Sequence, residues 1–187
     1  LHVCDRNLEQ IQRNKIDNTK AKHNLLVDVC MAAQFEGDSI KGYYPKYQEK
    51  YKDTGSTMCT MLARSFADIG DIIRGKDLYL GYNKKEKEQR KQLEENLQKI
   101  FKKIHNGLHD KIKSKYNDDA KKNYYQLRED WWNANRQEVW KAITCGHPGG
   151  TYFRQRACAR YFQTGEDCRC AAGDVPTYFD YVPQYLR

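Results

Sequence analysis

The sequence predicts a mostly α-helical bundle held by disulfide bonds, with a loop-rich, cysteine-containing segment at its C-terminal end. Apolar residues recur every three or four positions over several long stretches, which is the periodicity of helices with one buried face. Seven cysteines in 187 residues are typical of a protein that folds in an oxidising compartment. All three tryptophans lie between residues 127 and 143. Because each tryptophan buries about 150–250 Å², this segment is the expected centre of the core.

The N-terminal part of the chain is predicted to contain one helix after a short entry segment. This helix covers about residues 17–35, where Leu25, Val29 and further apolar residues share one face. The Glu-Gly-Asp sequence at residues 36–38 is expected to end it. The stretch 41–55 is rich in tyrosine and lysine and fits either a loop or a short helix.

Two more helices are predicted in the middle of the chain. Residues 57–74 carry the clearest apolar stripe, and Gly75 is expected to cap the C-terminal end of this helix. After a turn at residues 80–85, a charged helix is predicted from Lys84 to about Tyr116, with leucines and isoleucines on one face. The stripe of the first of these helices consists of Met58, Leu62, Phe66, Ile69 and Ile73.

The tryptophan helix is predicted over about residues 120–144, after a break and cap formed by residues 117–119 (Asn-Asp-Asp). Trp131 and Trp132 are adjacent and therefore point to different sides of it, while Trp140 lies two turns beyond Trp132. Together with the phenylalanine of the preceding stripe, they are the expected structural core.

The remainder of the chain is predicted to be mostly loop. A glycine- and proline-rich run at residues 146–150 ends the tryptophan helix. Cys145 is expected to tie the end of that helix to another part of the molecule, and disulfides are expected to pin the loop.

The cysteines form a disulfide framework whose pairing the sequence leaves open. An odd number cannot pair completely, so we expect the chain to be an excerpt of a longer protein, with Cys4 the cysteine that lacks its partner. The last four cysteines could instead bind zinc, but the Cys-x-Cys spacing departs from the usual Cys-x₂-Cys, and disulfides are favoured. The seven are Cys4, Cys30, Cys59, Cys145, Cys158, Cys168 and Cys170.

The polar residues beside the apolar stripes are expected to be structural. Asp68 and Asp71 could act as paired carboxylates, but ion pairs with arginines of the same or a neighbouring helix are favoured. Arg128, Glu129 and Asp130 are expected to form a buried ion-pair network that fixes the helix packing.

No motif for catalysis or for binding a cofactor stands out. His105 and His109 have metal-ligand spacing on a helix, yet no third ligand is near, so exposed histidines are favoured. Walker, GxGxxG, GxSxG and HExxH sequences are absent. We therefore expect neither an enzyme nor a bound metal or cofactor.

The net charge of +8 suggests a polyanionic partner. A linear sulfated glycan could be bound through many weak contacts, although glutamates among the lysines also fit a merely solvated helix face. A nucleic-acid-binding module would explain the charge but not seven cysteines without a zinc pattern, so no nucleic acid is expected. The basic candidates are Lys84, Lys85, Lys87, Arg90, Lys91, Lys99, Lys102, Lys103, Lys111, Lys113, Lys115, Arg154, Arg156 and Arg160.

Four segments resemble a known family over essentially the whole chain. They are ARSFADIGDIIRGKDLYLG at residues 63–81, LREDWWNANRQEVWKAITC at 127–145, CRC at 168–170 and DVPTYFDYVPQYLR at 174–187. In this order they resemble the Duffy-binding-like domain of the alpha class, which occurs near the N-terminus of Plasmodium falciparum erythrocyte membrane protein 1.

The resemblance implies a fold and a function. The fold would be a disulfide-bonded helical domain, with residues 1–56 the end of a first subdomain, residues 57–187 a second, and a third absent. The function would be adhesion at the extracellular face of the infected erythrocyte, with rosetting and antigenic variation. Partners would be host erythrocyte or endothelial receptors, sulfated or blood-group glycans, and host antibodies.

Two further expectations accompany this family. No apolar run reaches the roughly 20 residues that span a bilayer, so any membrane anchor would lie outside this piece. The tryptophans would belong to the shared scaffold. The alternative function is a scaffold and immune-variable part whose receptor contacts lie mainly in the missing subdomains.

Overall fold

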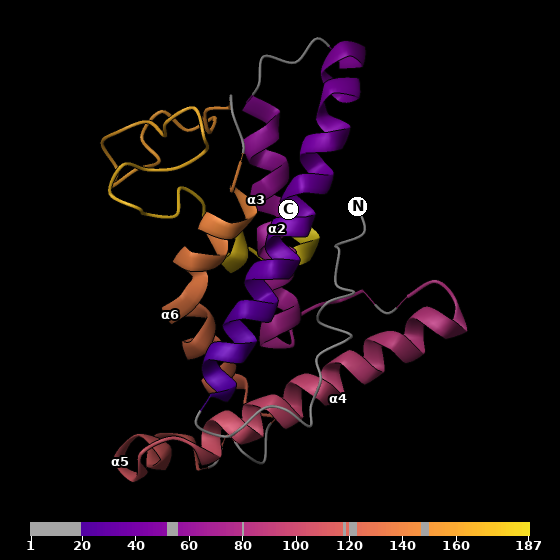
Figure 1. The fold of residues 1–187 in the computed structure, drawn as a ribbon, viewed down its shortest axis with the longest axis vertical. Coiled ribbons are helices and arrows are strands. Elements are labelled where there is room, and N and C mark those ends of the chain that lie inside the picture. The colour runs from indigo at the N-terminus through magenta and orange to yellow at the C-terminus, as the bar shows by residue number, and fades with distance from the viewer. Residues whose placement is uncertain (1–19, 52–55, 80, 118, 120–122, 147–149) are drawn as a thin grey trace.

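The computed structural model describes residues 20–51, 56–79, 81–117, 119, 123–146 and 150–187. Helices α2 (Ala21–Tyr51), α3 (Ser56–Arg74) and α6 (Tyr125–Ile143) pack side by side along the long axis of the molecule (Figure 1). Helix α4 (Lys84–Asn106) runs across one end of this bundle. The architecture is therefore a helical bundle, as predicted.

Helix α2 is longer than predicted. The break expected at residues 36–38 is wrong, because the helix continues through Gly37 and Pro45 to Tyr51. A Cβ at Gly37 would lie 3.1 Å from the carbonyl carbon of Ile143, so this glycine allows α2 to approach the end of α6 closely. The glycine serves helix packing here rather than a turn.

Helix α3 matches its prediction to within one residue, because its apolar stripe fills the centre of the bundle. Phe66 is fully buried, with its ring 5.1 Å from that of Trp132 and 5.3 Å from that of Trp140. Gly75 ends the helix with φ of +71°, and the next amide, of Lys76, donates to the carbonyl of Asp71 at 2.8 Å. This is the glycine cap expected from the sequence.

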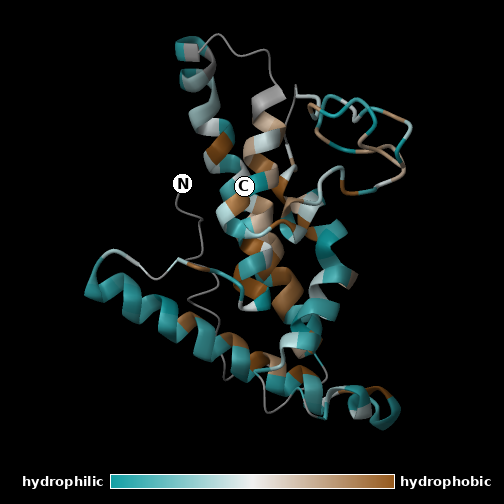
Figure 2. Ribbon diagram, turned by 180° about the vertical axis from the view of Figure 1, so that it is seen from behind, coloured by the Kyte–Doolittle hydropathy of each residue, from teal (hydrophilic) through white to brown (hydrophobic). Residues whose placement is uncertain are grey.

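Helix α4 is shorter than predicted. Asn83 caps its start by accepting a hydrogen bond from the amide of Glu86 at 2.9 Å. The helix ends at Asn106, and the two short helices α5 (Asp110–Lys113) and η2 (Ser114–Tyr116) follow. Gly107, with its low helix propensity, stands at the break that the apolar periodicity did not indicate. Figure 2 shows that α4 is mostly hydrophilic, with hydrophobic residues at intervals along it.

Helix α6 begins at Tyr125, five residues later than predicted. Both carboxylate oxygens of Asp119 accept amide hydrogen bonds from its first turn, from Gln126 at 3.0 Å and from Leu127 at 2.9 Å. Asp119 therefore caps the helix, as its sequence position suggested, although from a greater distance along the chain.

The tryptophans of α6 pack against different helices. Trp131 meets Phe101 of α4 edge-on, with ring centroids 6.2 Å apart. Trp132 and Trp140 are fully buried against α3. All three side chains lie in the core, and they link α6 to both α3 and α4.

The C-terminal segment is mostly loop, as predicted. Its only helical elements in the part that the structure describes are η4 (Phe179–Tyr181) and η5 (Gln184–Leu186). Disulfides join Cys59 to Cys168 and Cys158 to Cys170. These two bonds hold the loop to α3 and close it on itself.

The expectation that Cys145 ties the end of α6 to another segment is wrong for the described residues. The thiols of Cys145 and Cys30 are free there, and Cys4 lies outside the described part of the chain. The tie is instead made by Trp140, whose indole N–H donates to the carbonyl of Cys168 at 3.2 Å. Within the described ranges, no helix has the length and apolar character needed to span a membrane.

Candidate functional site

A buried acid joins the C-terminal segment to the bundle. The carboxylate of Asp180 accepts hydrogen bonds from the indole of Trp132 at 2.9 Å and from Arg136 at 2.8 Å through both of its oxygens. Arg74, itself buried, donates to the backbone carbonyl of Asp180. Two motifs that are far apart in the sequence therefore meet around one carboxylate.

The pair of carboxylates on α3 is structural, as expected. Arg187 lies 2.9 Å from Asp68 and 2.7 Å from Asp71, and Arg74 lies 3.0 Å from Asp71. Burial is the main cause that raises the pKa of both aspartates, and it outweighs the opposing effect of the neighbouring arginines. Both acids are held by arginines, which gives them a role in joining α3 to the C-terminal segment.

Two of the three residues before the tryptophans, Arg128 and Glu129, form the expected ion pairs, whereas Asp130 is exposed and accepts hydrogen bonds from Tyr116 at 2.7 Å and from Gln126 at 3.0 Å. Arg128 is fully buried, donates to the carbonyl of Ile73 at 2.6 Å, and binds both oxygens of Glu94 on α4 at 2.6 and 2.9 Å. Glu129 pairs with Arg74 at 3.1 Å and with Lys76. These contacts join α3, α4 and α6, so the residues that make them are structural. A binding site is therefore expected on the surfaces around this network.

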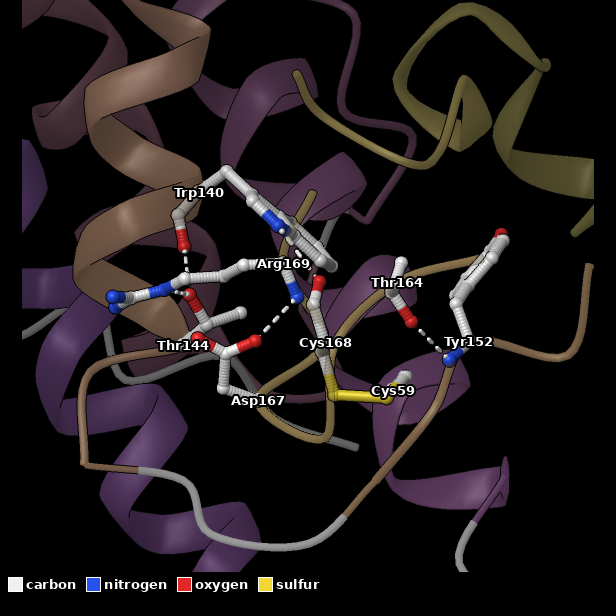
Figure 3. Close-up of a disulfide and its surroundings, with 8 residues drawn as sticks. All are labelled: Cys59, Trp140, Thr144, Tyr152, Thr164, Asp167, Cys168 and Arg169. Carbon is white, nitrogen blue, oxygen red and sulfur yellow. Dashed lines mark hydrogen bonds between the residues drawn. A yellow bond between two sulfur atoms is a disulfide. The ribbon is translucent and has the colours of Figure 1, made fainter. Parts of the chain in front are cut away.

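The disulfide-bonded loop is fixed to the C-terminal end of α6 (Figure 3). Besides the bond from Trp140 to Cys168, the guanidinium of Arg169 donates to the hydroxyl of Thr144 at 2.7 Å. On the other side of the Cys59–Cys168 bond, the amide of Tyr152 donates to the hydroxyl of Thr164 at 2.8 Å. The loop therefore has a defined shape without regular secondary structure.

This loop and α6 enclose an arginine-lined cleft of about 830 Å³. Three of its arginines are exposed and have no carboxylate partner among the described residues, whereas the fourth, Arg136, is already paired with Asp180. We call the cleft the arginine cleft. It is lined by Asn133, Arg136, Gln137, Arg154, Arg156, Ala157, Ala159, Arg160, Asp174, Val175, Pro176 and Tyr178.

The lining of the arginine cleft is chemically suited to an anion. Guanidinium groups bind carboxylate and sulfate-like groups through two parallel hydrogen bonds, which lysines cannot do. Only one acid, Asp174, lines the cleft. The structure thus brings together Arg154, Arg156 and Arg160 of the predicted basic set, and it adds Arg136 and Tyr178, which the sequence reasoning missed.

The lysines of the predicted set occupy a different surface. They lie along α4, α5 and η2, and most of them are exposed. We call this surface the lysine edge; it consists of Lys84, Lys85, Lys87, Arg90, Lys91, Lys99, Lys102, Lys103, Lys111, Lys113 and Lys115. A helix of this length is about 35 Å long, so the lysine edge has the dimensions to follow an extended polyanion.

Part of the lysine edge borders a second hollow of about 530 Å³ between α4 and the end of α3. Lys87, Arg90 and Lys91 line it, but so do Asp77 and Glu94. Arg90 pairs with Asp77 at 3.4 Å, and the glutamate is bound by a buried arginine. This hollow therefore has a mixed charge, unlike the arginine cleft.

The two basic surfaces lie on different elements of the molecule, the lysine edge on α4, α5 and η2 and the arginine cleft between the loop and α6. Figures 1 and 2 both show α4 at one end of the bundle and the loop that follows α6 near the other. The fourteen basic candidates therefore do not form one continuous face.

The remaining candidates do not form a metal site. His105 is buried on α4, whereas His109 caps α5, so the expectation of two exposed histidines on one helix is wrong. The helix break at Gly107 separates them. Three of the four cysteines of the zinc alternative are in disulfides, and the described residues contain no cluster of three potential ligands.

Together these features define a class of protein: a disulfide-bonded helical scaffold with charged surfaces suited to binding. The Duffy binding domain model matches residues 1–187, and the chain belongs to this family of adhesion domains. None of the curated proteins matches the chain significantly.

Solved structures agree with this assignment. The chain is 40% identical to the NTS-DBL1α1 domain of Plasmodium falciparum membrane protein 1 (PfEMP1) from the varO strain, with a TM-score of 0.79, and covers 99% of itself and 40% of that chain. For a PfEMP1 DBLβ domain bound to human ICAM-1 the identity is 30%, the TM-score 0.72, and the coverage 99% and 36%. For a second, ICAM-1-binding PfEMP1 DBLβ domain the identity is 34% and the TM-score 0.70, and the match covers 99% of this chain and 39% of that chain. The chain thus spans 40% or less of the length of each of these solved chains.

Proposed function

We propose that this chain is part of a host-receptor-binding adhesion domain exposed on the surface of the infected erythrocyte, and that it binds sulfated glycans through the arginine cleft. Membership of the Duffy binding family supports adhesion, and of two related DBLβ domains one is bound to human ICAM-1 and the other is ICAM-1-binding. The single observation that carries the glycan assignment is the convergence of Arg154, Arg156 and Arg160, without carboxylate partners among the described residues, on one cleft.

The dimensions and chemistry of the arginine cleft support a sulfated oligosaccharide of the heparan sulfate type. A volume of about 830 Å³ lies in the range of ligand sites and exceeds what one sugar ring fills. Uncharged blood-group sugars would leave the guanidinium groups without anionic partners, so they fit this cleft less well.

The lysine edge has a supporting role in this proposal. Exposed lysines separated by glutamates make weak, salt-screened contacts that contribute to attraction and to the association rate more than to specificity. Sulfated glycans would therefore be attracted by the whole basic chain and held by the arginine cleft.

Two triple variants with the same change in net charge test the assignment. We expect Arg154→Glu/Arg156→Glu/Arg160→Glu to lower heparin affinity by about tenfold or more at physiological salt, because each lost contact is worth roughly 0.5–1 kcal/mol. Lys99→Glu/Lys102→Glu/Lys103→Glu should weaken binding less and mainly reduce the association rate. Surface plasmon resonance on immobilised heparin at several salt concentrations measures both.

The outcomes separate the surfaces. Equal losses in the two variants would mean that net charge alone attracts heparin, and a larger loss in the lysine variant would move the site to α4. Heparin binding that neither variant alters would refute the proposal.

A second candidate function is a scaffold and immune-variable part whose receptor contacts lie mainly elsewhere. The chain spans only 40% of the varO domain chain, and its shared motifs are occupied by packing and ion pairs, which favours this alternative. Comparing heparin binding by this chain and by a complete domain would decide between them. Binding only by the complete domain would support the scaffold.

A further inference from the structure

A tight turn in the disulfide-bonded loop holds two residues other than glycine in the left-handed backbone region. Ala159 has a φ of +48° and Arg160 a φ of +66°. The amide of Tyr161 donates to the carbonyl of Cys158 at 3.0 Å, and Cys158 and Phe162 exchange amide–carbonyl hydrogen bonds of 2.9 and 3.0 Å. Hairpin turns with two positive φ values strongly favour asparagine and glycine, so alanine and arginine are costly here.

The base of this turn is rigid, while its tip is exposed. Cys158 is buried and bonded to Cys170, which anchors the turn to the loop. In contrast, Tyr161 is 77% exposed and Phe162 is 69% exposed. We call Arg160, Tyr161 and Phe162 the hairpin tip.

The composition of the hairpin tip is that of a protein-binding hot spot. Tyrosine and arginine are enriched among the residues that dominate binding energy, and aromatic side chains lose little conformational entropy when they become ordered. A rigid support lowers the ordering cost of binding further. Strained backbone that presents exposed aromatic side chains points to a function outside the packing of the fold.

We infer that the hairpin tip docks into an apolar pocket, rimmed by carboxylates, on a host protein. The two rings call for an apolar surface, since a sulfated glycan would leave much of them in water. Arg160 at the tip, with Arg154 and Arg156 lining the adjoining cleft, provides charge complementarity to an acidic rim. This contact rests on the proposed adhesion function and shares Arg160 with the proposed glycan site, but its two aromatic rings lie outside the lining of that site.

The test compares two double variants of the 187-residue chain. Tyr161→Ser/Phe162→Ser removes the aromatic rings of the hairpin tip, and Tyr185→Ser/Leu186→Ser is the matched control because those residues are 75% and 65% exposed elsewhere. The probe is human endothelial cells treated with heparinases, sialidase and peptide-N-glycosidase. The tip variant should lose at least about tenfold of the binding that survives this treatment, and the control should keep it.

Other readouts make the test decisive. Heparin binding and the unfolding temperature of the tip variant should remain those of the unmodified chain, which shows that the domain is folded and separates this contact from the glycan site. Trypsin treatment of the cells should abolish the glycosidase-resistant binding. The inference is overturned if no binding survives the glycosidases, if trypsin leaves it intact, or if the tip variant binds as well as the control.

Discussion

Gly37→Ala inserts one methyl group where α2 crosses the end of α6. The new Cβ would lie 3.1 Å from the carbonyl carbon of Ile143 and closer still to its oxygen, whereas carbon atoms in contact settle at about 3.5–4.0 Å. Because the obstructing atoms are backbone, no side chain can rotate away. The two helices, which share the most extensive helix–helix contact in the described bundle, must move apart.

The magnitude follows from two opposing effects. Overpacking a core costs about 1–3 kcal/mol, and this rigid contact belongs in the upper part of that range. Alanine regains roughly 1 kcal/mol of helix propensity over glycine. We therefore expect a net loss of about 1–2 kcal/mol in the free energy of unfolding.

Gly42→Ala in the same helix is the control. A Cβ there meets nothing within 4 Å, so only helix propensity acts and the chain should be stabilised by roughly 0.5–1 kcal/mol. Guanidinium unfolding of the oxidised chain, followed by tryptophan fluorescence, measures both variants. If Gly37→Ala were as stable as the unmodified chain, the packing argument would be refuted.

Three further predictions concern the cross-links and charges. Replacing Cys59 and Cys168 by alanine should cost about 5 kcal/mol, against about 3 kcal/mol for Cys158 and Cys170, since the first bond closes a separation of 109 residues and the second one of 12. Denaturant unfolding would show equal costs if loop length were irrelevant. Asp180→Asn should lower the free energy of unfolding by about 3 kcal/mol or more, because Arg136 loses its charge partner. The control Asp174→Asn, at an exposed position, should change it by less than about 0.5 kcal/mol. Similar values for the two variants would contradict the buried network. Burial raises the pKa of Glu94, but the hydrogen bond and charge of Arg128 outweigh it and hold that pKa below 4.5. In acid the unfolded chain therefore binds more protons than the folded chain. The stabilisation from this pair is complete above the unfolded pKa and is lost as the pH falls below about 4.5. Glu94→Gln should therefore flatten the decline of the unfolding free energy with falling pH.

Sequence patterns predicted elements well where packing follows local periodicity. The helix at 57–74 was predicted to within one residue because a strong apolar stripe and a capping glycine agree. In α2, by contrast, the Glu-Gly-Asp sequence at residues 36–38 suggested an end that does not exist. A glycine chosen for close helix contact has the same identity as one chosen for a turn, and only the position of Ile143 distinguishes them.

The candidate site was predictable only in part. The clustering of Arg154, Arg156 and Arg160 is visible in the sequence, but the cleft also needs Arg136 and Tyr178, which come from distant segments. Asp180, the acid that pairs with Arg136, lies in the C-terminal motif at residues 174–187. The tyrosine-rich sequence of this motif was the available signal that it takes part in the site. The sequence placed the lysines in the same set of basic candidates as these arginines. Charge composition does not show on which surface of the folded protein a side chain lies.

The sequence by itself determined the helical class, the presence of a disulfide framework, the basic charge, the family resemblance and the role of the tryptophan segment as scaffold. These properties depend on local periodicity, composition and short motifs. Tertiary structure alone decided which cysteines pair, where α2 and α4 end, and that the arginines and lysines occupy separate surfaces. Each of these depends on contacts between segments that are distant in sequence, and such contacts arise only when the whole chain is packed.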